Sequence, residues 1–175
     1  IIELKYKIEK KFKKIKLYNN VYGFQIQPDT QFSKGISNKQ IDEVAASFGF
    51  ALPWKYREML LTFSGLDRPL ISIDPINTET VSYKTDSFFY RYPEDFEKTK
   101  YLINEIKEFE SEVKDVLFNT GFDVSTLVGY VPIYSHRILV VFEDRYLSPV
   151  ISIMGADVIL YGTDLVDYLK NELLE

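Results

Sequence analysis

Apolar residues recur at helical spacing in two adjacent stretches between positions 36 and 65. Four residues of the first stretch fall at i, i+3, i+4 and i+7, the spacing of one buried helix face: Ile41, Val44, Ala45 and Phe48. Four residues of the second stretch repeat this spacing: Tyr56, Met59, Leu60 and Phe63. The pattern therefore predicts two amphipathic helices in succession.

Both predicted helices carry terminal signals. Ser37 and Gln40 form a capping box, and Ile36 and Ile41 are spaced for a hydrophobic staple across it. Gly49 is suited to the left-handed conformation that ends a helix.

In the second helix, Pro53 suits the first helical position and Gly65 is expected to end the helix. With residues 50–52 as the connection, the two helices form a hairpin, and each needs an apolar surface to cover its buried face.

The C-terminal part of the chain supplies such a surface. Four short stretches rich in β-branched and aromatic residues are separated by turn residues: Leu127–Tyr134, Arg137–Phe142, Val150–Ile153 and Val158–Tyr161. A last amphipathic helix follows, with Thr163 as its expected cap. We therefore expect an α+β fold: a twisted, mostly antiparallel sheet with helices packed mainly on one face.

The remaining segments complete a single globular domain. We expect helices at 2–17 and 93–118, the second long and charged, and short strands at 21–26, 70–73 and 80–83. Residues 28–35 are expected to form a loop. Residues 1–35, a basic helix and a lead-in strand, should pack on the domain formed by residues 36–175.

Charge is distributed unevenly along the chain. The first 16 residues hold seven lysines and two glutamates, so with a total of −5 the remainder carries −10. A basic amphipathic helix can bind anionic membranes or phosphates. A helix docked on the domain with its lysines in water explains the pattern more simply, and its apolar face would be Leu4, Ile8, Phe12 and Ile15. The acidic remainder opposes nucleic-acid binding.

The densest aromatic stretch is Ser87–Pro93. As a strand, it would place Phe88, Tyr90 and Tyr92 on one side, with Phe89 and Arg91 on the other. Such residues usually form the core and rim of a sheet, but Tyr and Arg are also favoured anchors at protein interfaces. Stacking on nucleobases is a third possibility.

Motifs in both halves resemble the SUKH superfamily, the Smi/Knr-type domain. The N-terminal match falls on Ile41, Leu52, Pro53, Tyr56, Leu60, Ser64 and Gly65. The C-terminal match falls on Val131-Pro132-Ile133, His136-Arg137, Pro149-Val150-x-Ser152-Ile153, Asp157-Val158-Ile159 and Tyr161-Gly162-x-Asp164-Leu165. The resemblance covers residues 36–175, with Ser135 at a position where the family often has glycine.

Candidate chemistry is sparse. Cysteine is absent, His136 is the only histidine, and no phosphate-loop, nucleophile-elbow or dinucleotide-binding motif occurs. We expect no catalytic, cofactor or metal site. Beside Arg137, His136 is expected to be structural, with its ring bonded to a backbone carbonyl, Asp157 or Asp164.

The resemblance implies a bacterial immunity protein that neutralises a toxin by direct binding. Regulatory scaffolding without a toxin partner is the alternative. Steering of the acidic body toward a basic toxin, such as a nuclease, would accelerate association. We expect five residues to form the contact surface: Asp86, Tyr90, Arg91, Glu94 and Asp95.

The chain has no apolar run long enough for a membrane span and no signal-peptide pattern. A cytoplasmic protein without a membrane partner is therefore expected.

Overall fold

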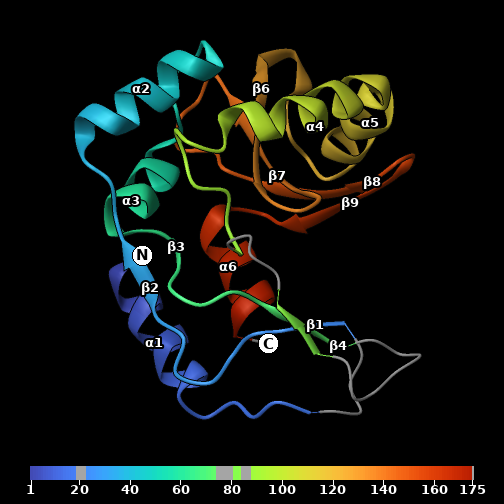
Figure 1. Cartoon of the computed structure of the whole chain (residues 1–175). Coiled ribbons are helices and arrows are strands. Elements are labelled where there is room, and N and C mark those ends of the chain that lie inside the picture. Colours follow the sequence, from blue (N-terminus) through green and yellow to red (C-terminus); the bar gives the residue numbers. More distant parts are fainter. Residues whose placement is uncertain (19–22, 74–80, 84–87, 175) are drawn as a thin grey trace.

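The central element of the fold is an antiparallel sheet with the strand order β6–β7–β8–β9. The computed structural model describes residues 1–18, 23–73, 81–83 and 88–174 (Figure 1). The four strands are β6 Leu127–Tyr134, β7 Arg137–Phe142, β8 Val150–Met154 and β9 Asp157–Gly162. All four were predicted from their β-branched and aromatic residues, and the α+β class is confirmed.

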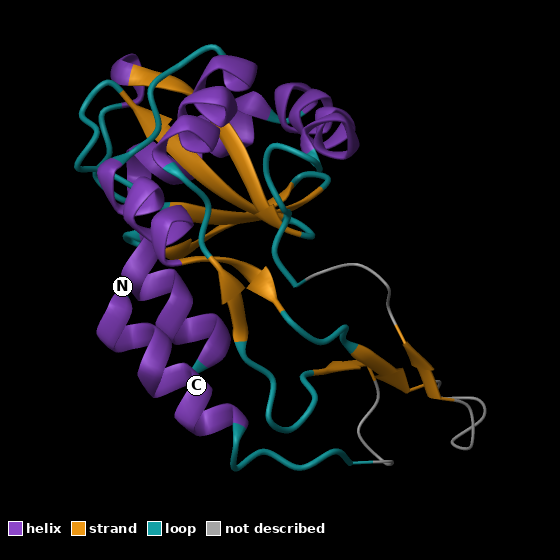
Figure 2. Ribbon diagram, turned by 60° about the vertical axis from the view of Figure 1, so that its left-hand side comes forward, coloured by secondary structure: helices purple, strands orange, loops and turns teal. Residues whose placement is uncertain are grey.

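Helices pack against this sheet from both sides. Their bounds are α1 Ile2–Phe12, α2 Asn38–Phe48, α3 Trp54–Thr62, α4 Phe96–Glu108, α5 Glu110–Asn119 and α6 Leu165–Leu173. In β7, alternate residues enter different core clusters: Leu139 and Val141 pack with α1, α2, α3 and α6, whereas Ile138 and Val140 pack with α4 and α5. Figure 2 shows the helices around the sheet. The expectation that helices lie mainly on one face was therefore incomplete, because α4 and α5 cover the second face.

The first helix of the predicted hairpin, α2, has the capped ends that the sequence predicts. Ser37 caps α2 in a capping box with Gln40, and Gly49 ends the helix at φ 81°. Ile41 and Val44 are buried, as is the Tyr56, Met59 and Leu60 stripe of α3. Local sequence signals set the bounds of α2, because its capping box and its terminal glycine each satisfy backbone groups within one turn.

The end of the hairpin differs from the prediction. Pro53 is the N-cap of α3 rather than its first helical residue, and α3 ends at Thr62. Gly65 lies in a short strand, β3 Phe63–Leu66, which pairs with β2 Phe32–Lys34. The predictions of Gly65 as a helix stop and of residues 28–35 as a loop were therefore wrong, because pairing between these distant segments extends both of them.

The predicted helix at 93–118 is two helices. Phe109, at φ −113° and ψ 28°, separates α4 from α5. Its side chain packs against the cluster between these helices and the sheet. The apolar pattern continues through the break, so periodicity alone did not reveal it.

The N- and C-terminal helices lie side by side. Leu4, Ile8 and Phe12 of α1 are buried in the same cluster as Leu165 and Leu169 of α6. Asp164 rather than Thr163 caps α6, since its side chain accepts a hydrogen bond from Asp167 N at 2.8 Å. A small sheet formed by β1 Gly23–Gln25, β4 Ile71–Ile73 and β5 Val81–Tyr83 lies away from the main sheet (Figures 1 and 2).

The aromatic stretch after residue 87 is not a strand. Phe88, Phe89 and Tyr92 are all buried, so the predicted alternation of sides does not hold. The segment follows the outer edge of β6: Tyr90 N donates to Ile133 O at 2.9 Å, and Tyr92 Oη donates to Pro132 O at 2.8 Å. The aromatic residues therefore anchor an irregular segment that covers part of this edge.

Substitutions at two glycines test how closely the backbone segments around the helical hairpin approach each other. A Cβ on Gly35 would overlap the backbone carbonyl of Leu61, so Gly35→Ala should lower the free energy of unfolding by about 3 kcal/mol. A Cβ on Gly49 would meet no neighbouring atom, so only the positive φ opposes a side chain there. Gly49→Ala should therefore lower the free energy of unfolding by about 1 kcal/mol. Urea denaturation of both variants measures the difference, and equal losses would contradict the close approach at Gly35.

Candidate functional site

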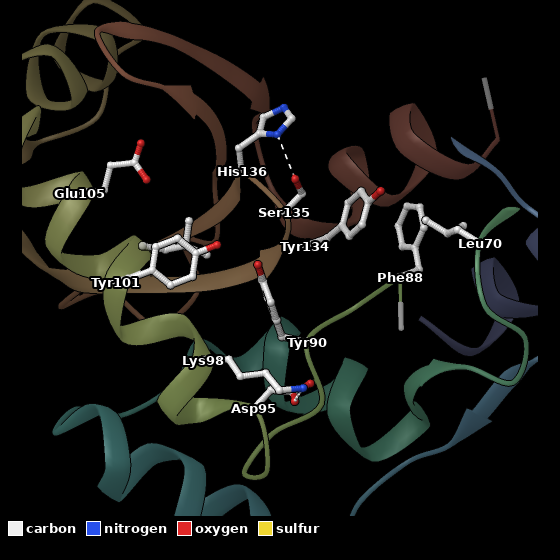
Figure 3. Close-up of a pocket in the computed structure, with 11 residues that line it drawn as sticks. Leu70, Phe88, Tyr90, Asp95, Lys98, Tyr101, Glu105, Tyr134, Ser135 and His136 are labelled. Atoms are coloured by element: carbon white, nitrogen blue, oxygen red, sulfur yellow. Dashed lines mark hydrogen bonds and ion pairs between the residues drawn. The ribbon is translucent and has the colours of Figure 1, made fainter. Parts of the chain in front are cut away.

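An open cavity of about 430 Å³ lies between α4 and the tip of the β6–β7 hairpin. Its lining combines aromatic, acidic and basic side chains: Leu70, Phe88, Tyr90, Asp95, Lys98, Tyr101, Leu102, Glu105, Tyr134, Ser135 and His136. Figure 3 shows these side chains around a shared space. Two acidic residues, Asp95 and Glu105, therefore line the same cavity as His136.

One face of α4 forms one side of the cavity. Lys98, Tyr101, Leu102 and Glu105 recur at i, i+3, i+4 and i+7, which places them on the same face of the helix. Leu102 is buried and holds the helix against the core, whereas Tyr101 is 62% exposed. This face therefore presents an aromatic ring and two charged groups to solvent above an apolar base.

The N-terminal end of α4 is held by Asp95. Its carboxylate accepts a hydrogen bond from Arg91 N at 2.7 Å and pairs with Lys98 Nζ at 2.9 Å. The structural role of Asp95 follows from these two contacts, since negative charge is favoured at a helix N-terminus.

Aromatic residues form the opposite wall. The rings of Phe88 and Tyr134 stack with centroids 4.0 Å apart and an interplanar angle of 12°. Burial raises the pKa of the Tyr134 phenol, with a smaller contribution from the Glu172 carboxylate. The Tyr134 hydroxyl is therefore neutral at physiological pH and is available as a hydrogen-bond donor.

His136 lies in the two-residue turn between β6 and β7. Ser135 adopts φ 47°, the left-handed conformation that a tight hairpin turn requires. Ser135 Oγ and His136 Nδ1 are hydrogen-bonded at 3.2 Å. The prediction that His136 contacts Asp157 or Asp164 was wrong, because Asp164 caps α6 and the turn directs the ring toward its own neighbour.

The environment of His136 favours the neutral imidazole. Partial burial lowers its pKa below the ordinary 6.5, and the nearby Arg137 guanidinium lowers it further, against the opposing effect of Glu172. In Figure 3, His136 and Asp95 lie on opposite sides of the cavity. The His136 imidazole and the Asp95 carboxylate are therefore not arranged as a hydrogen-bonded pair.

Arg137 ties the sheet to the last helix. Its Nε donates to Glu172 Oε2 at 2.9 Å and its Nη1 donates to Ser152 Oγ at 2.8 Å, while its guanidinium lies 3.9 Å from the Tyr161 ring centroid. These contacts to β8, β9 and α6 give Arg137 a structural role.

The predicted contact residues are only partly brought together. Tyr90 and Asp95 line the cavity, whereas Glu94 is exposed outside its lining. The backbone of Arg91 bonds to Asp95, and its side chain donates to Leu66 O at 3.0 Å. Asp86 lies outside the described residues.

Sequence reasoning missed the residues that α4 contributes. Tyr101 and Glu105 lie one turn apart among many charged residues, and their spacing could have placed them on one helix face. Only the approach of the β6–β7 turn makes that face part of a cavity. Ser135 was missed as well. It follows Glu105 by 30 residues in the sequence, a separation that no local pattern bridges.

A second missed group fastens the Leu52-Pro53 motif. Arg145 donates from Nε and Nη2 to Leu52 O at 3.0 and 2.9 Å, and its guanidinium lies 3.7 Å from the Trp54 ring centroid. Trp54 N donates in turn to Arg145 O at 2.9 Å. The side chain of Leu52 is buried, so the motif is anchored through both its side chain and its carbonyl.

Within the described part of the chain, no three or more His, Cys, Asp or Glu residues are grouped so that they could hold a metal ion. None of the described helices combines the length and the apolar character needed to cross a membrane.

A scan against protein-family models gave no match to this chain, and searches of curated proteins and of solved structures also gave none. The resemblance to the SUKH superfamily therefore remains a prediction from the sequence motifs.

The environment of His136 can be tested directly, because it is the only histidine. Its NMR titration midpoint should lie below 6.5, and Arg137→Gln should raise it by removing the neighbouring positive charge. The pKa of His136 is lower in the folded chain than in the unfolded chain. The contribution of neutral His136 to the free energy of unfolding is therefore fully present above pH 6.5, and it is lost as the pH falls through the pKa of the folded chain. A midpoint at or above 6.5 in the unmodified chain would contradict this environment.

The Arg145 contacts predict a specific loss in Arg145→Lys. Lysine cannot reproduce two hydrogen bonds and a stacked guanidinium, so the free energy of unfolding should fall by about 1–2 kcal/mol. Emission from Trp54, the only tryptophan, should shift to longer wavelength. Arg68→Lys, at an exposed residue with a bond to Pro28 O, is the control and should cost less than about 0.5 kcal/mol. Equal losses in the two variants would show that the contact with Leu52 is not stabilising.

Proposed function

We propose that this chain is a non-enzymatic binding protein, an immunity protein that acts in the cytoplasm and neutralises a bacterial toxin by direct contact. The observation that carries the proposal is the open cavity beside α4, where tyrosines and charged side chains meet. Tyrosine anchors surrounded by polar groups are typical of protein-binding surfaces. The toxin assignment comes from the SUKH resemblance of the sequence.

The charge of the chain supports a basic partner. Residues beyond position 16 carry a net charge of −10. Three acidic residues lie at or just before the start of α4: Glu94, Asp95 and Glu97. A surface of this sign increases the rate of encounter with a positively charged protein, most strongly at low salt. Nuclease toxins need positive charge to bind phosphates, so they are suitable partners.

The arrangement of the cavity favours binding over catalysis. Ser135 and His136 are hydrogen-bonded, but they are neighbours in one turn. Among the described residues, no carboxylate is hydrogen-bonded to the His136 ring, so the third group that orients the base in a catalytic triad has no counterpart there.

Affinity purification of the tagged chain from its native host tests the proposal. We expect one protein in stoichiometric amount, because an immunity protein must occupy its toxin fully. Expression of that protein alone should arrest growth of a test host, and co-expression of this chain should restore growth. The toxin should be recovered with unchanged mass, since direct binding does not modify it.

Two outcomes would contradict this function. Many substoichiometric partners, none of them toxic, would favour the scaffold alternative. A toxin recovered with altered mass would instead identify this chain as an enzyme acting on it.

A further inference from the structure

We propose that the cavity beside α4 receives an arginine side chain presented by a protein partner, with Glu105 as its ion-pair partner and Tyr101 as its stacking surface. The inference rests on the proposed binding function and specifies the chemistry of its contact. It depends on three features of the cavity: an unpaired carboxylate, an adjacent exposed ring and an opening to solvent.

The unpaired carboxylate is that of Glu105. Across the described residues, it makes no ion pair or hydrogen bond, although it is only partly exposed. The other acid in the lining, Asp95, is already held by Lys98 and by Arg91 N. Glu105 therefore retains the capacity to accept hydrogen bonds from an incoming cation, and a partly desolvated carboxylate gains more from this than one fully in water.

The charges around Glu105 permit a cation to enter. Lys98 is the basic residue of the lining, and its charge is offset by Asp95 at 2.9 Å. His136 contributes no full positive charge at neutral pH, since burial lowers its pKa. The described lining of the cavity thus has a net negative charge that originates from Glu105.

The stacking surface is next to this acid. Tyr101 precedes Glu105 by one helical turn, so the two side chains lie on the same face of α4. Figure 3 shows them side by side at one side of the cavity. A cation over an aromatic face is attracted by the ring, and a planar guanidinium can stack on the ring and donate hydrogen bonds to a carboxylate at the same time.

The shape of the cavity favours an arginine on a protein. A volume of about 430 Å³ exceeds what a guanidinium alone fills, and the cavity is only partly enclosed. An open site encloses a small free ligand poorly, because most small-molecule sites bury the greater part of their ligand. A partner surface would close the opening and provide the remaining contacts.

An NMR titration of the full chain tests the inference without the toxin. The probe is the peptide acetyl-Gly-Arg-Gly-amide, and its matched control carries citrulline, which has a similar shape but no charge. The arginine peptide should shift the Tyr101 ring and Glu105 amide signals, with a dissociation constant at least about fivefold lower than that of the citrulline peptide.

Variants localise the contact. Glu105→Gln should weaken binding of the arginine peptide about fivefold, and Tyr101→Ala should weaken it by a similar factor. Glu108→Gln is the matched control: it removes the same charge from an exposed residue of α4 outside the cavity lining and should leave the affinity unchanged. Unchanged amide spectra away from the substitution show that each variant is folded.

Three results would overturn the inference: equal binding of the two peptides, equal effects of Glu105→Gln and Glu108→Gln, or tighter binding of free arginine than of the peptide. The last would identify a site for a small metabolite. If a toxin is captured from the host but the arginine peptide does not bind, the proposed function stands and this contact is wrong. If the peptide binds as expected but no toxin exists, the contact stands and the immunity function is wrong.

Discussion

Burial of both faces of strands β7 and β8 is the constraint on which the fold depends. Alternate side chains of a strand point to opposite faces, so a strand that is apolar throughout needs cover on both. In β7, Leu139 is buried among the hairpin helices and α6, while its neighbour Val140 is buried under α4 and α5. Neither helix layer could be removed without exposing apolar side chains of the central strands to water.

The cavity is a consequence of this two-layer cover. The β6–β7 turn lies at the end of the sheet, where Ser135 is exposed and His136 only partly buried. There α4 presents Tyr101 and Glu105 above the buried Leu102, and the stacked pair of Phe88 and Tyr134 forms the opposing wall. Polar residues can line this space because it opens to solvent, so their groups need not all be satisfied within the protein.

Structural and recognition roles are divided among similar residue types. Arg137 and Arg145 are held by hydrogen bonds and aromatic stacking, which fastens α6 and the Leu52-Pro53 turn to the sheet. Glu105 and Tyr101 have no such restraint from the residues that the structure describes, and both face the open cavity. A rigid surround with a few unsatisfied groups is the arrangement that binding favours, since little conformational entropy is lost when a partner arrives.

The sequence by itself determined the elements whose signals are local. The Ser37–Gln40 capping box and the Gly49 terminus were predictable because each satisfies backbone groups within one helical turn, and the four strands of the main sheet followed from their composition. Tertiary structure alone decided the break at Phe109, the strand around Gly65 and the irregular course of residues 88–92, because each depends on a partner distant in sequence. The site shows the same division. His136 and Tyr90 could be singled out as unusual residues, but Glu105 gained its significance only when folding brought the β6–β7 turn next to α4.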